Sequence, residues 1–157
     1  MRYASMNIRI VTNIGTNSKE TVFAGFDRKL FLQLAPPFPK LNLIRFDGSI
    51  KGNEVHLETN FILFKQKWIS LIVENGSSES EVYFVDEGIT LPFPLKYWRH
   101  RHIVRQVGPS VEIEDNLHFS TKNKMVDILL YLPFYLLFLY RKPVYKKIFK
   151  LESQVPF

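Results

Sequence analysis

The chain has 157 residues, of which 46% are hydrophobic and 23% charged. These values are ordinary for a globular protein and exclude a disordered or fibrous one, and the length suits a single domain. The absence of cysteine excludes disulfides, thiolate metal sites and cysteine nucleophiles. Aromatic residues make up 15% of the chain, which indicates a core or cavity walled by rings. The formal net charge of +6 predicts a mildly basic surface.

The amino-terminal residues contain no apolar stretch long enough for a secretory signal, so we expect a cytoplasmic protein. One later segment, 128–140, is strongly apolar. It is shorter than the roughly 20 residues needed to cross a bilayer, and it contains Pro133. We therefore interpret it as part of a buried helix and predict no transmembrane segment.

The first third of the chain predicts one strand and two short helices. Residues 8–13 have strand character, and Ser18 can cap the helical stretch that follows. Apolar residues then recur at near-helical spacing until Pro36 and Pro37 end the pattern.

The middle of the chain is typical of an antiparallel meander. Turn signals rich in glycine, asparagine, aspartate and serine separate short runs of β-forming residues. We predict strands at 41–47, 54–64, 67–74, 81–87, 96–106 and 111–120. In this interpretation Asp86 precedes a Glu-Gly turn and serves as a turn former.

Residues 124–150 predict a long helix, because apolar side chains recur mainly at three- and four-residue steps. Pro133 lacks an amide hydrogen and should bend or split this helix. The element order predicts an α+β fold in which a seven-stranded curved antiparallel sheet wraps around the long C-terminal helix. We expect one domain over 1–157, with its core at about 8–150.

The hairpin of the last two strands carries the most information. Alternation puts Trp98, His100 and His102 on one face of the first strand, and three arginines on the other. Because three arginines are not buried together, the Trp/His face is predicted to point inward. On the next strand, Asp115 and Phe119 share the inward face.

If residues 107–110 form the turn, His102 lies opposite Asp115. Three interpretations of this inward acid stay open. We favour a His–Asp pair that satisfies its own hydrogen bonds in an apolar wall. The pair could instead anchor a ligand in a cavity, or His100, His102 and Asp115 could bind a metal ion. Acid–base catalysis is chemically possible, but no activated nucleophile or oxyanion device accompanies the pair.

These residues resemble a branch of the SRPBCC superfamily, which includes START lipid-transfer domains and polyketide cyclase-like proteins. The likeness to its bacterial branch spans about 8–150 and rests on Asp86, Pro92-Phe93, the W-x-H-x-H strand with Trp98, His100 and His102, Asp115, and the aromatic-Tyr-Arg stretch that ends at Arg141. Pro133 and Pro143 in the terminal helix depart from the pattern of the family.

The resemblance implies a helix-grip fold with an apolar cavity between the sheet and the terminal helix. Members bind lipids, sterols, polyketides or other aromatic molecules, and some are enzymes. We expect the chain to bind or transport a hydrophobic small molecule and not to be an enzyme, and we expect no metal or other cofactor. The alternative is a cyclase- or dehydratase-like enzyme that uses the His–Asp pair in the same cavity. The expected ligand-contacting residues are Trp68, Phe84, Trp98, His100, His102, Asp115, Phe119 and Phe134.

Basic residues near the carboxyl end suggest a second kind of partner. Arg141, Lys142, Lys146 and Lys147 are interleaved with apolar residues, a pattern that suits peripheral contact with an anionic membrane. A solvated outer face explains most of the remaining positive charge. Nucleic-acid binding would need a stronger basic stripe or a recognised motif, so we expect no such partner. No nucleotide-binding or hydrolase motif occurs.

Overall fold

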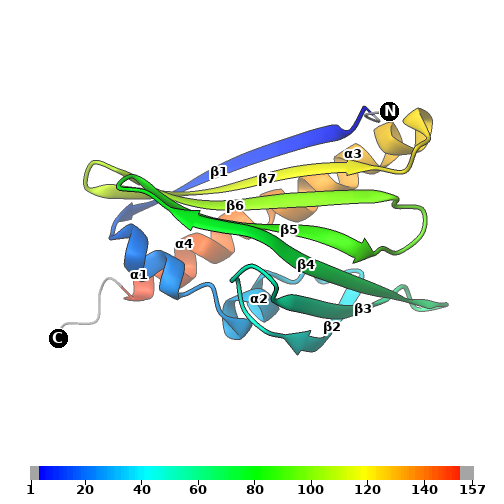
Figure 1. The fold of residues 1–157 in the computed structure, drawn as a ribbon, viewed down its shortest axis with the longest axis horizontal. Coiled ribbons are helices and arrows are strands. Elements are labelled where there is room, and N and C mark those ends of the chain that lie inside the picture. The colour runs from blue at the N-terminus through cyan, green and yellow to red at the C-terminus, as the bar shows by residue number, and fades with distance from the viewer. Residues whose placement is uncertain (1–3, 153–157) are drawn as a thin grey trace.

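Seven antiparallel strands form one curved sheet in the computed structural model, which describes residues 4–152 (Figure 1). The strands are β1 Met6–Thr16, β2 Lys40–Phe46, β3 Glu54–Asn60, β4 Lys65–Ser77, β5 Glu81–Thr90, β6 Tyr97–Val107 and β7 Ser110–Ser120. Their spatial order is β1-β7-β6-β5-β4-β3-β2. The predicted seven-stranded sheet is confirmed, and β2 to β7 form the expected meander.

Two short helices follow β1, as predicted. Helix α1 covers Lys19–Ala24 and helix α2 covers Arg28–Leu34. Ser18 caps α1 by accepting a hydrogen bond from the amide of Thr21, and Asp27 caps α2 by accepting one from the amide of Leu30. The cap at Asp27 begins a second helix, so the helical stretch after Ser18 divides into the two predicted helices.

The predicted long helix is present as two consecutive segments, α3 Lys124–Leu139 and α4 Arg141–Glu152. Pro133 lies inside α3, whereas the break falls at Tyr140. Because Pro143 has no amide hydrogen to donate to the carbonyl of Leu139, one helical hydrogen bond is missing there. Figure 1 shows the two segments following one another along the same face of the sheet. None of the helices in residues 4–152 has the length and apolar character needed to cross a membrane.

Two apolar clusters join the helices to the inner face of the sheet. One cluster contains Val104 of β6 and Ile113 of β7 and packs against α1, α2 and α4. The other contains Trp98 of β6 and Phe119 of β7 and packs against α3. On these two strands, polar side chains lie between the two clusters, so the polar residues are held in place by hydrophobic packing on both sides.

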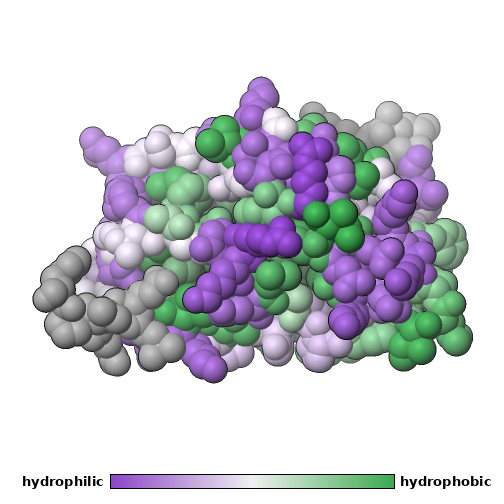
Figure 2. All heavy atoms as spheres, turned by 90° about the horizontal axis from the view of Figure 1, so that it is seen from below, coloured by the Kyte–Doolittle hydropathy of each residue, from purple (hydrophilic) through white to green (hydrophobic). Residues whose placement is uncertain are grey.

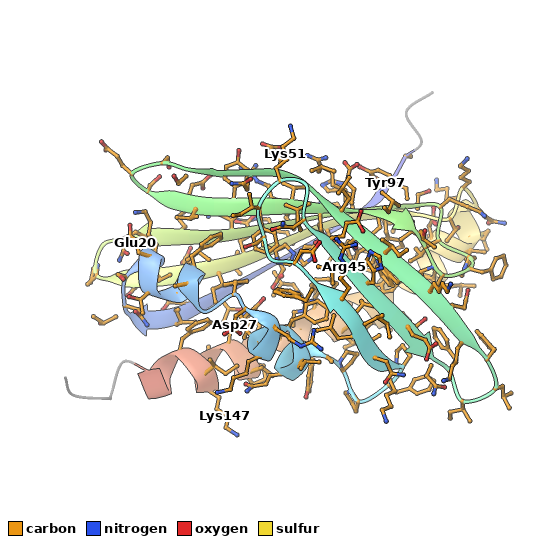
Figure 3. All side chains as sticks on the ribbon, turned by 60° about the horizontal axis from the view of Figure 1, so that its bottom comes forward. Glu20, Asp27, Arg45, Lys51, Tyr97 and Lys147 are labelled. Atoms are coloured by element: carbon orange, nitrogen blue, oxygen red, sulfur yellow. The ribbon has the colours of Figure 1, made fainter. Side chains whose placement is uncertain are left out.

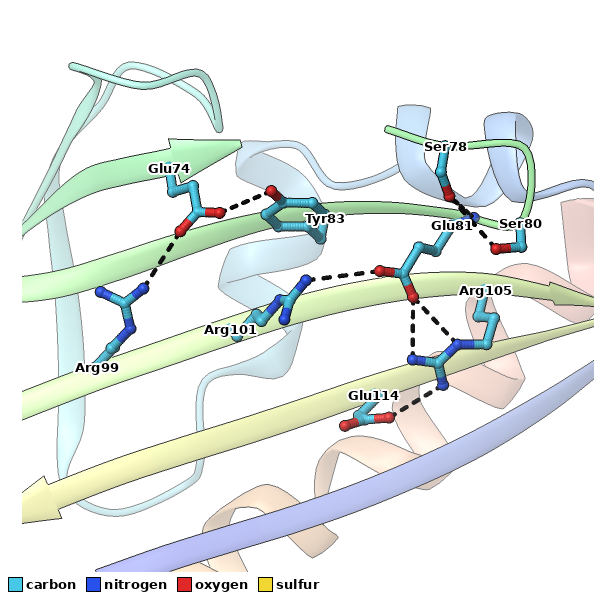
Figure 4. Close-up of polar contacts among 9 residues, drawn as sticks. All are labelled: Glu74, Ser78, Ser80, Glu81, Tyr83, Arg99, Arg101, Arg105 and Glu114. Carbon is cyan, nitrogen blue, oxygen red and sulfur yellow. Dashed lines mark hydrogen bonds and ion pairs between the residues drawn. The ribbon is translucent and has the colours of Figure 1, made fainter. Parts of the chain in front are cut away.

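The outer face of the sheet carries the arginines of β6, as alternation predicted. Arg99 pairs with Glu74 and Glu87, and Arg101 pairs with Glu81. Arg105 also bonds to Glu81, so neighbouring strands are linked by a ladder of ion pairs (Figure 4). The inward direction of Trp98 and the histidines follows from this arrangement.

Hydrophobic side chains also reach the surface. In the view from below in Figure 2, they form patches between hydrophilic ones. Among the most exposed are Ile62 and Leu63, in the turn between β3 and β4, and Leu129 on α3. Single exposed apolar residues are common in folded proteins and by themselves indicate no binding site.

Candidate functional site

A cavity of about 470 Å³ lies between the inner face of the sheet, α2 and α3. This volume is in the range of small-molecule binding sites. Most of its wall is apolar or aromatic, while a polar region is formed by Asp86, His100, His102 and Arg141. Phe38 and Phe93 belong to the wall and are 54% and 78% exposed, so the cavity reaches the surface beside them. In Figure 3, many side chains of the inner faces point into the space between sheet and helices.

Six of the eight residues expected to contact a ligand line this cavity. They are Trp68, Phe84, Trp98, His100, His102 and Phe134. The other two lie behind the wall. Phe119 is fully buried and packs edge-on against Phe134, with ring centroids 4.9 Å apart. Asp115 is 2% exposed and contacts the histidines from behind.

The aromatic part of the wall is rigidly packed. The rings of Trp68 and Trp98 meet edge to face with centroids 4.6 Å apart, and Phe134 contacts Trp98 at 5.5 Å. The indole nitrogen of Trp68 donates to Ser70 over 3.2 Å. Since this polar atom is already satisfied, the ring can border an apolar space without an unpaired donor.

In the polar region, two carboxylates bracket two imidazoles. The Oδ2 atom of Asp86 lies 2.9 Å from Nε2 of His102 and 3.6 Å from Nδ1 of His100. The Oδ1 atom of Asp115 lies 2.9 Å from Nε2 of His100 and 3.8 Å from Nδ1 of His102. Each imidazole therefore turns one nitrogen toward each acid. Arg141 completes the group by donating to Asp115 over 3.1 Å.

The predicted register of the hairpin is confirmed, because His102 is the direct partner of Asp115. The predicted hydrogen bond is wrong, however. Asp115 bonds to His100, its diagonal neighbour, while His102 bonds to Asp86 on the other adjacent strand. Each histidine has an acid on both sides, and the rotamers of the rings decide which contact becomes the hydrogen bond.

Two further predictions are corrected by this arrangement. Asp86 is not a turn former, because it lies within β5 opposite His100 and its side chain is 13% exposed. Arg141 is not a surface cation, because its side chain is 18% exposed and bonds to Asp115. Lys147 by contrast points away from the molecule in Figure 3, so any contact of α4 with a membrane would exclude Arg141.

The charge states of the cluster follow from burial and from its neighbours. Burial and the nearby His102 lower the pKa of His100 to about 4, against the opposing effect of Asp115. Burial alone would raise the pKa of Asp115, but Arg141 and His100 hold it well below the usual range. Burial would also raise the pKa of Asp86, but the hydrogen bond with His102 and the nearby His100 and Arg141 together lower it. At neutral pH the group contains two carboxylates, one guanidinium and a neutral His100.

The sequence contains a signal for the inward position of both Asp86 and Arg141. Alternation along 81–87 places Asp86 on the same face as Phe84, which lines the cavity. Arg141 occupies a helical stripe with Phe134, Phe138 and Tyr145, at steps of three and four residues that face the sheet. Both residues lie inside the predicted elements 81–87 and 124–150, so both signals were present in the sequence.

The arrangement allows three kinds of chemistry. The polar region can form hydrogen bonds with a ligand in the cavity, and His102 with Asp86 can accept or donate a proton. A metal ion could also be held here. Each of Asp86, His100 and His102 offers one ligand atom, and these three atoms lie within 4.8 Å of one another. Asp115 lies on the far side of the histidines from this set.

Comparison with solved structures shows the fold. Norcoclaurine synthase from Thalictrum flavum, in a complex with dopamine and hydroxybenzaldehyde, matches with a TM-score of 0.67 at 14% identity over 98% of this chain and 90% of that one. A START superfamily protein from Mycobacterium smegmatis gives 0.62 at 12% identity, over 92% and 99% of the chains. The Zhui aromatase/cyclase of a Streptomyces species gives 0.54 at 10%, over 74% and 68%. At such identities the likeness concerns the fold alone.

No protein-family model and no curated protein sequence matches this chain. The comparison therefore depends on the structural neighbours, and it is consistent with the helix-grip fold predicted from the sequence.

Proposed function

On the premise that the chain belongs by its helix-grip fold to the SRPBCC superfamily, we propose that it binds or transports a hydrophobic small molecule in the cavity between the sheet and α3. The observation that carries this proposal is a ring-lined cavity of about 470 Å³ with polar groups gathered in one part of its wall. Apolar walls with a few placed polar groups are typical of small-molecule sites.

The chemistry of the wall favours an aromatic or polycyclic ligand with one polar group. Rings of Trp68, Trp98 and Phe134 can pack against a flat apolar body. His100, His102 and Asp86 can bind a hydroxyl, carbonyl or amine at the other end. The neighbour in complex with dopamine and hydroxybenzaldehyde supports the same class, because both molecules are an aromatic ring with polar substituents.

Neighbouring residues of α3 provide a matched test. Leu130 lines the cavity, whereas Leu129 is 71% exposed. The polycyclic probe aminoanthracene should bind the native chain saturably, seen as enhanced probe fluorescence. Leu130→Glu places a charge against the apolar ligand and should weaken binding at least about tenfold, or about 1.4 kcal/mol. Leu129→Glu should leave binding unchanged.

Absence of saturable binding by the native chain, or equal weakening by the two glutamates, would contradict the proposal. Native mass spectrometry of the freshly purified chain is the independent measurement. A retained aromatic or lipid molecule should be displaced by aminoanthracene if both occupy the cavity.

A second candidate function is catalysis on a bound carbonyl compound. It is favoured by one observation: His102 and Asp86 are hydrogen-bonded over 2.9 Å and both line the cavity. A histidine oriented by a carboxylate is suited to removing a proton next to a carbonyl. NMR should then show solvent deuterium exchanging into phenylacetaldehyde faster than in buffer, and His102→Gln should abolish the effect. A native chain no faster than buffer eliminates this candidate.

A further inference from the structure

We propose that Asp86, His100 and His102 form a binding site for one divalent transition-metal ion in the wall of the cavity. This inference goes beyond the proposed function, because the site needs no organic ligand. Asp86 comes from β5 and both histidines come from β6, so two paired strands provide the set. All three residues line the cavity.

The distances suit coordination of a single ion. Two ligand atoms bound to zinc at about 2.1 Å in a tetrahedral site lie about 3.4 Å apart. The Oδ2 atom of Asp86 is 2.9 Å from Nε2 of His102 and 3.6 Å from Nδ1 of His100. The three donor atoms lie within 4.8 Å of one another. Small side-chain movements would therefore bring them to coordinating positions.

The direction of the His100 ring leaves one of its nitrogens available for an ion. His100 donates from Nε2 to Asp115 over 2.9 Å, so Nδ1 is the atom that can coordinate. This nitrogen faces the carboxylate of Asp86 at 3.6 Å. An ion between these two groups would form a coordinate bond with each of them.

His102 provides a second, independent indication. Its Nδ1 atom is buried without a hydrogen-bond partner, although the ring is bonded to Asp86 through Nε2. If Nε2 coordinates an ion, the ring proton moves to Nδ1, which lies 3.8 Å from Asp115. The unsatisfied nitrogen then points a donor at a carboxylate.

Asp115 and Arg141 form the support that metal-bound histidines usually have. Coordinating imidazoles commonly donate their other N–H to a carboxylate, which orients the ring. Asp115 takes this position for His100 at 2.9 Å and lies 3.8 Å from the free nitrogen of His102, and Arg141 fixes it with a hydrogen bond of 3.1 Å. Asp115 is absent from the cavity wall, so we assign it as a positioning residue and not as a ligand.

The ligand set indicates the class of ion. Two imidazoles and one carboxylate suit Zn²⁺ and Fe²⁺, and three protein ligands leave a coordination position for water or for a bound molecule. That position would face the cavity. The catalytic candidate above depends on the hydrogen bond between Nε2 of His102 and Asp86, which an ion bound to both atoms would replace, so the two proposals exclude each other.

The test uses the tag-free chain, treated with EDTA and titrated with Zn²⁺ by calorimetry. We expect one ion per chain at micromolar or tighter affinity, and Co²⁺ should give visible absorption bands of a low-coordinate site. Asp86→Asn and His102→Gln should each weaken Zn²⁺ binding at least about 100-fold. Asp86→Asn keeps the side-chain shape, so it serves as the folded variant if His102→Gln does not fold.

The matched control is His56→Gln, because His56 also pairs with a carboxylate, that of Glu54 at 2.6 Å, away from the cavity. It should bind Zn²⁺ as the native chain does. Failure of the native chain to bind Zn²⁺ below about 100 µM, or unchanged binding by Asp86→Asn, would overturn the proposal. Aminoanthracene titration of the EDTA-treated chain tests the proposed function separately, since apolar binding needs no ion.

Discussion

Arg141, the first residue of α4, donates a hydrogen bond of 3.1 Å to Asp115 at the middle of β7. The pair connects the C-terminal helix to the sheet through two groups that are 18% and 2% exposed. Burial lowers the pKa of the guanidinium, but Asp115, Tyr145 and Asp86 together raise it above its ordinary value, so the pair stays ionised.

We predict a large loss of stability when this pair is broken. Asp115→Asn leaves Arg141 buried without its anion, and it should lower the free energy of unfolding by about 3–5 kcal/mol in urea denaturation. The double variant Asp115→Asn/Arg141→Met removes both charges and should lose less than the sum of the single changes. Additive losses would show that the two groups are not coupled.

Glu114 provides a prediction about pH. It lies on the outer face of β7, where Arg9 contacts it through two hydrogen bonds of 2.9 Å and Arg105 through one of 3.2 Å. Burial raises the pKa of this carboxyl, but the two arginines lower it below the ordinary 4.5. The unfolded chain therefore binds the proton more readily than the folded one.

The stability that Glu114 contributes is complete above pH 4.5 and is lost as the pH falls through the lower pKa of the folded state. Glu114→Gln should make the free energy of unfolding less dependent on pH in that acid range. Urea denaturation at a series of pH values measures this slope. The exposed Glu79→Gln is the control and should keep the native slope; a native slope in Glu114→Gln as well would contradict the prediction.

Phe119 lies in the packed layer behind the cavity wall, whereas Phe93 lies at the exposed rim of the cavity. Phe119 is fully buried, while Phe93 is 78% exposed. Phe119→Ala removes a ring from a close-packed core and should cost about 3–5 kcal/mol. Phe93→Ala should change stability by less than about 0.5 kcal/mol. Thermal unfolding of both variants checks this contrast, and similar melting temperatures would disprove it.

The position of Pro133 within α3 leads to a prediction about the route by which a ligand enters the cavity. It lies in the interior of α3 and lines the cavity, and it cannot donate to the carbonyl of Leu129. If α3 opens at this weak point, Pro133→Ala should stabilise the helix and slow the association of aminoanthracene several-fold in stopped-flow fluorescence. The exposed Leu132→Ala is the control. Unchanged association in Pro133→Ala would indicate another route.

The inward face of β6 was predictable because side chains of a strand alternate with a period of two. Three arginines on one face left Trp98 and His100 on the other, and the turn at 107–110 set the register with β7. The identity of the hydrogen-bonded partner was not predictable. Opposite and diagonal neighbours are both within reach of an imidazole, and the ring rotamer selects between them.

Arg141 and Asp86 show the other limit of sequence reasoning. Both residue types are normally exposed, so composition assigns them to surface and turn. Their burial depends on each having an oppositely charged or hydrogen-bonding partner on another element, Asp115 for Arg141 and His102 for Asp86. The first partner becomes apparent only after α4 is placed against the sheet, and the second only after the register of β5 with β6 is known.

The position of β1 in the sheet has a consequence for folding. It pairs with β7, so the directly opposite residues Met6 and Phe119 are more than 100 positions apart in the chain. Contacts of such long range make folding slow. During synthesis Ile8 and Ile10 stay exposed until β7 and α3, which belong to the same apolar cluster, have been made. Exposed apolar segments are prone to aggregation. We therefore expect the nascent chain to depend on chaperones until these later elements have been made.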